Sequence, residues 1–292
     1  MANLKEIRSR IASVKSTQQI TSAMKMVSAA KLRKSQTAIL KLRPYSQKMA
    51  QIMAKAGTSL SDDMPFARQS KDKQHVLLVV LTSNKGLCSV FNSSVIKLAA
   101  KQTEFYLSQG ADVSIMSYGK KGSAALKKFQ NITYIGENDD IWEKLSFDNV
   151  NNEAQKIMDG FLQKKYDRVE IIYNQFKNAA TQLPTAEKFL PVSNDDFTDN
   201  TSAQNQYNKD YIFAPSKKEI ISSVIPQSLK TQMYKCFLDS FTSEHGARMT
   251  SMNKATDNAQ SLLKELTLTY NKQRQSDITN QIIEVSNGAN AV

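Results

Sequence analysis

The sequence has few of the residues that interrupt helices: nine glycines and six prolines among 292 residues. Long unbroken helices are therefore possible. Cysteine is also scarce. The two cysteines are Cys88 and Cys236, and no secretory signal precedes them, so we expect free, buried thiols in a reducing compartment. No apolar run approaches the roughly 20 residues that a membrane-spanning helix requires.

The motifs of common catalytic and cofactor sites are missing. There is no GxxxxGK[ST] phosphate loop, and Gly119–Gly122 (GKKG) is interpreted as a basic turn. Gly86-Leu87-Cys88 follows a predicted strand but lacks the further glycines of a dinucleotide fingerprint. Neither His75 nor His245 has a partner at metal-ligand spacing. Two adjacent acid pairs fit solvated loops better than acid/base pairs: Asp139-Asp140 and Asp195-Asp196. We therefore expect no catalytic residue, cofactor or metal in this chain.

Acidic residues are scarce in the first segment, which carries nearly all of the net charge of +12. Residues 1–48 hold eleven Lys/Arg and a single acid, Glu6, whereas residues 217–292 hold nine bases and seven acids. This bias favours an acidic partner, which could be nucleic acid, anionic lipid or an acidic protein surface. The alternative is a solvated helix face.

The N-terminal segment has the pattern of one helix over residues 3–56, with Asn3 as N-cap and Glu6 three residues later, as in a capping box. Apolar residues recur along it at steps of three and four: Leu4, Ile7, Ile11, Val14, Ile20, Met24, Val27, Ile39, Leu42, Tyr45, Met49, Ile52 and Ala56. The helix would extend roughly 80 Å. Pro44 is expected to kink it or to break a hydrogen bond.

The middle of the chain has a different period. After a linker over residues 57–73, short apolar runs predict buried strands at 75–83, 113–117 and 168–173. Helical stretches lie between and beside them, around residues 91–108, 120–129 and 148–164, and residues 193–210 have the composition of an exposed loop. Strands that alternate with helices predict an α/β domain with a partly parallel sheet.

The helical period returns from about Lys217 and continues to Gly288, with Pro226 expected at a joint or in the first turn. Its apolar positions are Met233, Phe237, Phe241, Met252, Ala255, Ala259, Leu262, Leu266, Tyr270, Ile278, Ile282 and Val285. Two such helices need a partner for their apolar stripes, and each is the nearest candidate for the other. We predict an α/β fold in which a long antiparallel coiled coil, residues 1–57 and 217–292, carries an inserted Rossmann-like α/β domain, residues 58–216.

The seam of this coiled coil is expected to be irregular. Gln18 and Thr21 fall where a regular heptad has apolar residues. Small residues in the same stretch would allow the two helices to approach closely: Ser22, Ala23, Ser28, Ala29 and Ala30.

Distinctive motifs lie at both ends of the chain. The first end has KEIRSRI at Lys5–Ile11, STQQITSAMKMV at Ser16–Val27 and Arg43-Pro44-Tyr45. Gly86-Leu87-Cys88 follows, with Asn92 a few residues on. The other end has Ala247-Arg248-Met249, Ala255–Ala259 (ATDNA), Leu266–Leu268 (LTL), Tyr270–Gln275 (YNKQRQ), Ile278-Thr279 and Glu284. In this order and over the whole chain, the motifs closely resemble those of the gamma subunit family of rotary ATP synthases.

The resemblance implies the central rotor shaft of a proton-driven ATP synthase. The implied partners are three alpha and three beta subunits, the epsilon subunit and the membrane rotor c-ring, and no nucleic acid. Rotation would present a different face of the shaft to each beta subunit, which couples proton flow to ATP turnover and regulates both. Catalysis would belong to the beta subunits. The chain would be a peripheral protein on the cytoplasmic face of a bacterial inner membrane.

The resemblance also implies partner-contact residues. Met24 and Arg248 match positions near an acidic lever loop of a beta subunit, and the alternatives are seam packing for Met24 and a solvated face for Arg248. Arg274 and Gln275 match a pair that meets a catch loop, and Thr279 matches a neighbouring polar contact. An apolar tip would turn in a bearing, formed by Ile282, Val285, Ala289 and Val292.

The sequence departs from the family pattern at three places. Ser89-Val90 stands where glycine is usual, Gly246 stands where alanine is usual at an expected cost of up to about 1 kcal/mol, and Pro226 is unusual. Two other classes of protein were weighed. A nucleic-acid-binding coiled coil leaves the α/β domain without a role, and no motif supports an α/β enzyme with helical arms.

Overall fold

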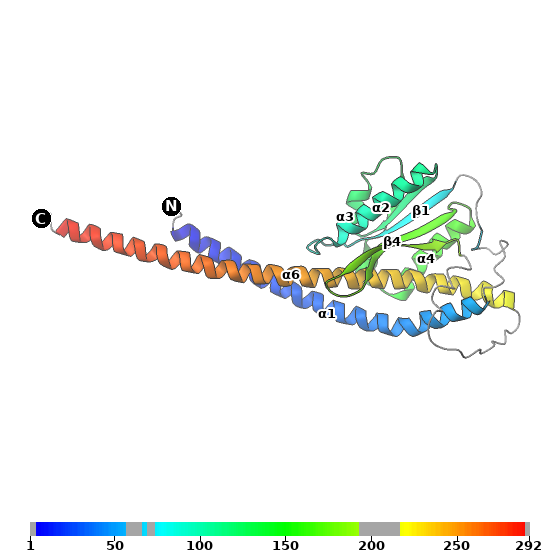
Figure 1. Cartoon of the computed structure of the whole chain (residues 1–292), viewed down its shortest axis with the longest axis horizontal. Helices are drawn as coiled ribbons and strands as arrows, with labels where there is room; N and C mark the ends of the chain where they lie inside the picture. Colours follow the sequence, from blue (N-terminus) through cyan, green and yellow to red (C-terminus); the bar gives the residue numbers. More distant parts are fainter. Residues whose placement is uncertain (1–3, 57–65, 69–73, 193–216, 290–292) are drawn as a thin grey trace. The chain divides into compact units, whose positions relative to one another are not determined.

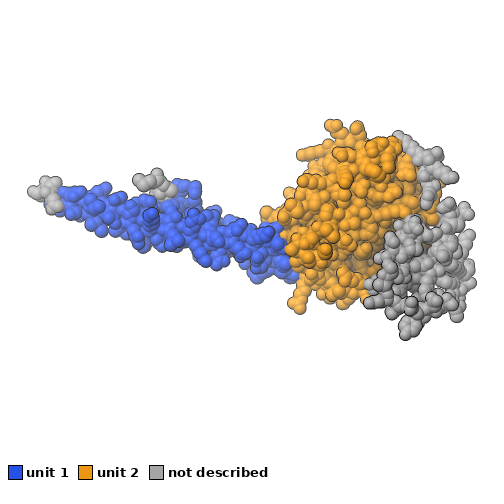
Figure 2. All heavy atoms as spheres, in the orientation of Figure 1, with its two compact units in different colours: residues 1–30, 248–292 blue, residues 31–247 orange. Residues whose placement is uncertain are grey.

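The computed structural model describes residues 4–56, 66–68, 74–192 and 217–289 (Figure 1). Two long helices, α1 (Leu4–Ala56) and α6 (Lys217–Ala289), enclose the remaining elements in the sequence. The chain forms two compact units, residues 1–30 with 248–292 and residues 31–247, coloured separately in Figure 2. The unit boundaries fall inside α1 and α6. The three-segment division predicted from the sequence therefore stays a prediction.

The second unit contains a five-stranded sheet in the order β3-β2-β1-β4-β5. The strands are β1 (His75–Leu81), β2 (Asp112–Tyr118), β3 (Thr133–Glu137), β4 (Arg168–Phe176) and β5 (Gln182–Leu190). All neighbours pair in parallel except β4 and β5, which are antiparallel. This confirms the predicted α/β class and the predicted partly parallel sheet, in which three of the four strand pairs are parallel.

Two layers of helices bury the sheet. One face packs against α2 (Phe91–Ser108) and α3 (Lys120–Leu126). The other face packs against α4 (Phe147–Leu162) and the part of α6 from Ile225 to Phe237. The central strand β1 is buried on both faces from Val76 onward, which explains its continuous apolar sequence.

Three elements were missed by the sequence analysis: β3, β5 and the 3-10 helix η2 (Asp140–Trp142). Both strands lie at the sheet edges, where they are only partly buried and carry polar residues. Pro184 is tolerated in β5 because an edge strand has one unpaired side. The predicted loop 193–210, most of the predicted linker 57–73 and the N-cap Asn3 lie outside the described residues.

The two helix prolines do not end their helices. Pro44 lies inside α1, which continues to Ala56. Pro226 lies nine residues after the start of α6 at Lys217, so the expectation of a joint or a first turn there is wrong. Burial of Ile225 and Leu229 on either side of Pro226 opposes the cost of a proline in a helix interior.

Gly246 has a packing role that its helix propensity does not reveal. A Cβ at this position would lie 3.3 Å from the Cα of Ala179 and 3.4 Å from its carbonyl oxygen. Ala179 belongs to the turn between β4 and β5. The glycine therefore lets α6 approach this turn, and the close approach accounts for a residue that is otherwise unfavourable in a helix.

The first unit is an antiparallel helix pair. The guanidinium of Arg8 donates to the hydroxyl of Tyr270 over 2.7 Å, the hydroxyl oxygens of Thr21 and Thr256 lie 2.9 Å apart, and Lys25 donates to Asn253. Residue numbers rise along α1 as they fall along α6. The predicted antiparallel pairing of the terminal helices is thus present in this unit.

The seam of this pair keeps a regular heptad spacing, and polar residues occupy some of its positions, as predicted for Gln18 and Thr21. Buried or half-buried positions of α1 continue from Leu4, Ile7, Ile11 and Val14 to Gln18, Thr21, Lys25 and Ser28. Ile20 and Val27, which the sequence analysis assigned to the apolar stripe, are each 58% exposed, and Leu262 is also exposed. Small and polar side chains fill the seam, and several large apolar side chains point away from it.

Candidate partner-contact site

The carboxyl ends of β1 and β2, where a Rossmann-like fold usually binds a ligand, are filled by the chain itself. A Cβ on Gly119 would lie 2.3 Å from the carbonyl oxygen of Thr82, and one on Gly122 would lie 2.4 Å from the Thr82 hydroxyl. Gly119 also has a φ of 120°, a backbone conformation that residues with a side chain rarely adopt. Both glycines are therefore explained by the contact with Thr82.

The backbone amides that could cradle a phosphate already have acceptors. Gly119 donates to the Asp139 carboxylate over 3.0 Å, and Lys120 donates to Asn84 over 3.2 Å. Lys121 donates to the carbonyl of Ser83, and Gly122 donates to the hydroxyl of Thr82 over 2.9 Å. A phosphate would have to displace these partners. Asp139 lies in a loop, as predicted, and is half-buried because its carboxylate accepts from the turn at Gly119.

The Gly86-Leu87-Cys88 turn is closed by a small polar cluster. Asn92 accepts from the backbone N–H of Ser83 over 2.9 Å and donates to the Ser83 hydroxyl and, over 3.3 Å, to the sulfur of Cys88. Leu87 and Ser89 have φ values of 61° and 55°, in the left-handed region that glycine adopts at little cost. Ser89 thus takes a backbone conformation that glycine adopts more easily. The turn exposes the side chain of Leu87.

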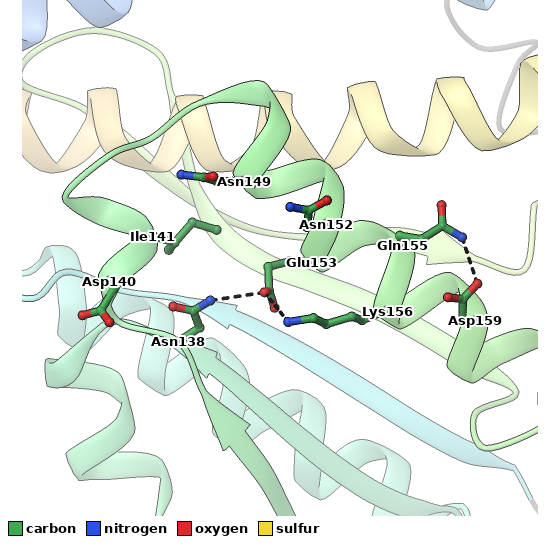
Figure 3. Close-up of a pocket in the computed structure, with 9 residues that line it drawn as sticks. All are labelled: Asn138, Asp140, Ile141, Asn149, Asn152, Glu153, Gln155, Lys156 and Asp159. Carbon is green, nitrogen blue, oxygen red and sulfur yellow. Dashed lines mark hydrogen bonds and ion pairs between the residues drawn. The ribbon is translucent and has the colours of Figure 1, made fainter.

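A polar groove of about 580 Å³ lies beside α4 (Figure 3). Its central acid, Glu153, accepts from the hydroxyl of Tyr118 over 2.9 Å, from Asn138 over 3.2 Å and from Lys156 over 2.8 Å. Burial, together with the Glu153 charge, raises the pKa of Tyr118 well above its usual value, so the phenol stays a neutral donor. These three hydrogen bonds satisfy the buried carboxylate and connect β2, the loop after β3 and α4.

Both cysteines are free and buried, as predicted. Among the described residues, no group of histidine, cysteine and acidic side chains could hold a metal ion. None of the helices described has an apolar stretch that would cross a bilayer.

Two of the predicted contact residues lie on the helix pair near Lys25. Met24 is half-buried, which leaves both seam packing and partner contact open. Arg248 is only 5% exposed, so it is not on a solvated face. The structure does not test a contact between either residue and another subunit.

The remaining contact residues lie towards the end of α6 and are exposed: Arg274, Gln275 and Thr279. Arg8 of α1 meets Tyr270, so the same register brings Leu4 to the level of Arg274. The Thr279 hydroxyl donates to the carbonyl of Gln275 over 2.9 Å. Arg274 and Gln275 thus lie on α6 where the described part of α1 begins.

Exposed apolar side chains accompany these residues, and the sequence analysis missed several of them as contact candidates. On the helix pair they are Ile20, Met26, Val27, Leu262, Leu268, Ile278, Ile282, Ile283 and Val285. The heptad that begins at Leu4 continues through Gln18 and Thr21. Ile20 and Val27 do not fall on this heptad, so the same spacing places them outside the seam. The predicted tip residues Ile282 and Val285 are among the exposed set, and Val292 lies outside the described residues. So many exposed apolar side chains indicate a surface that another protein covers.

Comparison with known proteins agrees with these features. A family model described as ATP synthase matches residues 3–292. Two proteins named ATP synthase gamma chain, from Flavobacterium psychrophilum and Flavobacterium johnsoniae, are each 50% identical to this chain over 100% of its length and 99% of theirs. A rotor chain of the Euglena gracilis mitochondrial ATP synthase has a similar fold, with a TM-score of 0.63 and 21% identity over 94% of this chain and 98% of that one. The chain belongs to the ATP synthase gamma chain family.

Proposed function

We propose that this chain is the central shaft of a rotary ATP synthase and couples the turning of a membrane ring to the nucleotide cycle of the catalytic beta subunits. The observation that carries the proposal is the family relationship over the whole chain. The chain is a non-catalytic subunit. This role agrees with a Rossmann-like edge whose amides are bonded to the chain's own side chains.

The proposed partners are three alpha subunits, three beta subunits, an epsilon subunit and the c-ring. Similar folds occur in the central stalk and c-ring structure of the Tetrahymena thermophila enzyme, with a TM-score of 0.58 and 23% identity over 81% of this chain and 99% of that one. The exposed apolar residues and the eleven bases of residues 1–48 supply a surface for such partners. We place the complex on the cytoplasmic face of a bacterial inner membrane, with this chain attached peripherally through its partners.

Coupling requires that the shaft contact the three beta subunits differently. A contact that forms in one rotary state and breaks in the others shifts the nucleotide affinity of one site at a time. We assign such contacts to Met24, Arg248, Arg274, Gln275 and Thr279. Arg274 and Gln275 are exposed neighbours about 100° apart around α6, so they can address one loop from two directions. The arginine offers a fork of donors to a carboxylate, and the glutamine can both donate and accept.

Replacement of Arg274 and Gln275 by alanine tests this assignment. The full chain is assembled with alpha and beta subunits, and ATP turnover is measured per assembled complex. We expect turnover to fall several-fold with assembly unchanged, because exposed side chains contribute less than about 0.5 kcal/mol to folding. Asn271 and Lys272, an exposed amide and base on the same helix, provide the matched control pair. Equal turnover in the two double variants would remove Arg274 and Gln275 from the mechanism.

A further inference from the structure

A cluster of polar and ionisable side chains lies between α6 and strands β4 and β5. Its centre is the carboxylate of Glu187 on β5, which accepts from the hydroxyl of Tyr173 over 2.6 Å and from the amide of Gln232 over 2.9 Å. The ammonium of Lys235 lies 3.5 Å away, and the thiol of Cys236 lies 3.7 Å away. Burial alone would raise the pKa of Glu187, but Lys235, Tyr173 and Gln232 together lower it. Glu187 is therefore held as a carboxylate.

Asp239 is a second acid in this cluster, and its surroundings are different. It lies one helical turn after Lys235 on α6 and is 8% exposed. Among the described residues, no hydrogen-bond donor is directed at its carboxylate, and no cation lies within ion-pair distance. The donors of the cluster are directed at Glu187. Burial raises the pKa of Asp239 to about 6; Lys235 and Arg43 act against this rise, and the charge of Glu187 adds to it.

We propose that Asp239 is a proton-linked switch in the packing of α6: the ionised carboxylate weakens the packing of α6 against β4 and β5, and uptake of one proton strengthens it. The physical reason is that the carboxylate, on a residue that is 8% exposed, loses most of its hydration on folding without gaining a donor from the described residues. The neutral acid has a much smaller desolvation cost. Glu187 cannot play this part because its negative charge is matched by its donors.

The charged groups that act on Asp239 are Lys235 on α6, Glu187 on β5 and Arg43 on α1. The Asp239 charge in turn raises the pKa of Cys236 on α6 and of Tyr173 on β4. Burial raises the pKa of Cys236 well above its usual value, so it remains a neutral thiol. Asp239 is thus the acid of this cluster that would change its charge near neutral pH. Protonation of Asp239 at lower pH would thus strengthen the packing of α6 against strands β4 and β5.

The direction of the effect follows from the two pKa values. The pKa of Asp239 is about 6 in the folded chain and 3.8 in the reference state. Folding therefore favours the protonated form, and its contribution to stability is lost as the pH rises from about 4 to above 6. Asp239→Asn mimics the protonated form at every pH. We compare the equilibrium constant for folding of Asp239→Asn with that of the wild type. This ratio should be about ten times larger at pH 8 than at pH 5.

The test is denaturant unfolding of the full chain at pH 5 and pH 8, for the wild type and Asp239→Asn. Trp142, the only tryptophan, has its ring centre 5.3 Å from that of Phe237 on α6, so its fluorescence reports on this packing. Asp257→Asn, which removes an exposed acid from the same helix, is the control and should show no such dependence. An Asp239→Asn effect that is the same at both pH values, or a loss of stability at pH 8, would overturn the proposal.

A second measurement applies if Asp239→Asn does not fold. Amide hydrogen exchange of residues 235–243 in the wild-type chain, corrected for the intrinsic rate, should slow as the pH falls through about 6. Protection that is constant across this range would also contradict the proposal.

Discussion

Single residues show how the chain fills the strand ends of this Rossmann-like unit with its own side chains. Thr82 is fully buried, and its hydroxyl donates towards the carbonyl of Gly119 over 3.0 Å and accepts from the N–H of Gly122. The two glycines leave room for this threonine. The Thr82 side chain and the turn at Gly119–Gly122 thus fill the space at the carboxyl ends of β1 and β2.

Gly122→Ala should therefore be strongly destabilising. Its Cβ would lie 2.4 Å from the Thr82 hydroxyl oxygen and 2.7 Å from the Thr82 methyl group, and a buried β-branched residue cannot easily move. We expect a loss of about 1–3 kcal/mol in the free energy of unfolding, measured by Trp142 fluorescence in denaturant. Gly136→Ala is the matched control, because its Cβ would meet no atom within 4 Å. Similar losses in both variants would refute the role assigned to Thr82.

At the scale of whole elements, the unit 1 helix pair is joined by small and polar side chains. Thr21 and Thr256 are in contact, yet each hydroxyl also has a carbonyl within reach on its own helix, Gln18 and Met252 respectively. The contact between the two threonines therefore sets the register of the two helices and contributes only modestly to stability.

A double-mutant cycle measures this contribution. Thr21→Val and Thr256→Val should each lower stability by about 0.5–1.5 kcal/mol, while the double variant should lose less than the sum, because either single change already removes the contact between the two hydroxyls. Thermal unfolding followed by far-UV circular dichroism reports on the helices. Thr269→Val, at an exposed position with the same bond to its own helix, is the control. Strictly additive losses would show that the two hydroxyls do not interact.

The sequence predicted the helices and central strands well because their patterns are determined by burial. The helix at 91–108 has the predicted bounds, and β1, β2 and β4 overlap the predicted strands. The edge strands β3 and β5 lack a continuous apolar run, so periodicity could not reveal them. The seam positions Ile7 to Val14, and the polar positions Gln18 and Thr21, were predicted correctly, whereas the apolar pattern wrongly added Ile20 and Val27. The contact residues came from the family resemblance, because exposed polar residues leave no periodic signal.

At the scale of the whole molecule, we expect the basic segment, residues 1–48, to contact acidic surfaces of the partner subunits in the assembled complex. Lys25 is unsuitable for a test because it donates to Asn253 within the helix pair. Lys31, Arg33 and Lys34 are exposed. Reversing these three charges should lower coupled ATP synthesis several-fold and change the salt dependence of assembly, since they would seat the helix against acidic loops.

The control for this prediction reverses three exposed lysines of the α/β unit: Lys101, Lys128 and Lys165. The change in net charge is the same, so a comparable loss of synthesis would show that net charge matters and that the basic helix does not. In either variant, each exposed substitution should change the free energy of unfolding by less than about 0.5 kcal/mol.

The central claim is that the chain turns inside its partners, and observation of rotation tests it most directly. Glu104 is exposed on α2, and Cys88 and Cys236 are buried, so Glu104→Cys allows a probe to be attached to the α/β unit selectively. With the alpha and beta subunits fixed to a surface, we predict that the probe rotates in one direction when ATP is supplied and stops without it. A probe that stays fixed while the complex hydrolyses ATP would contradict the account.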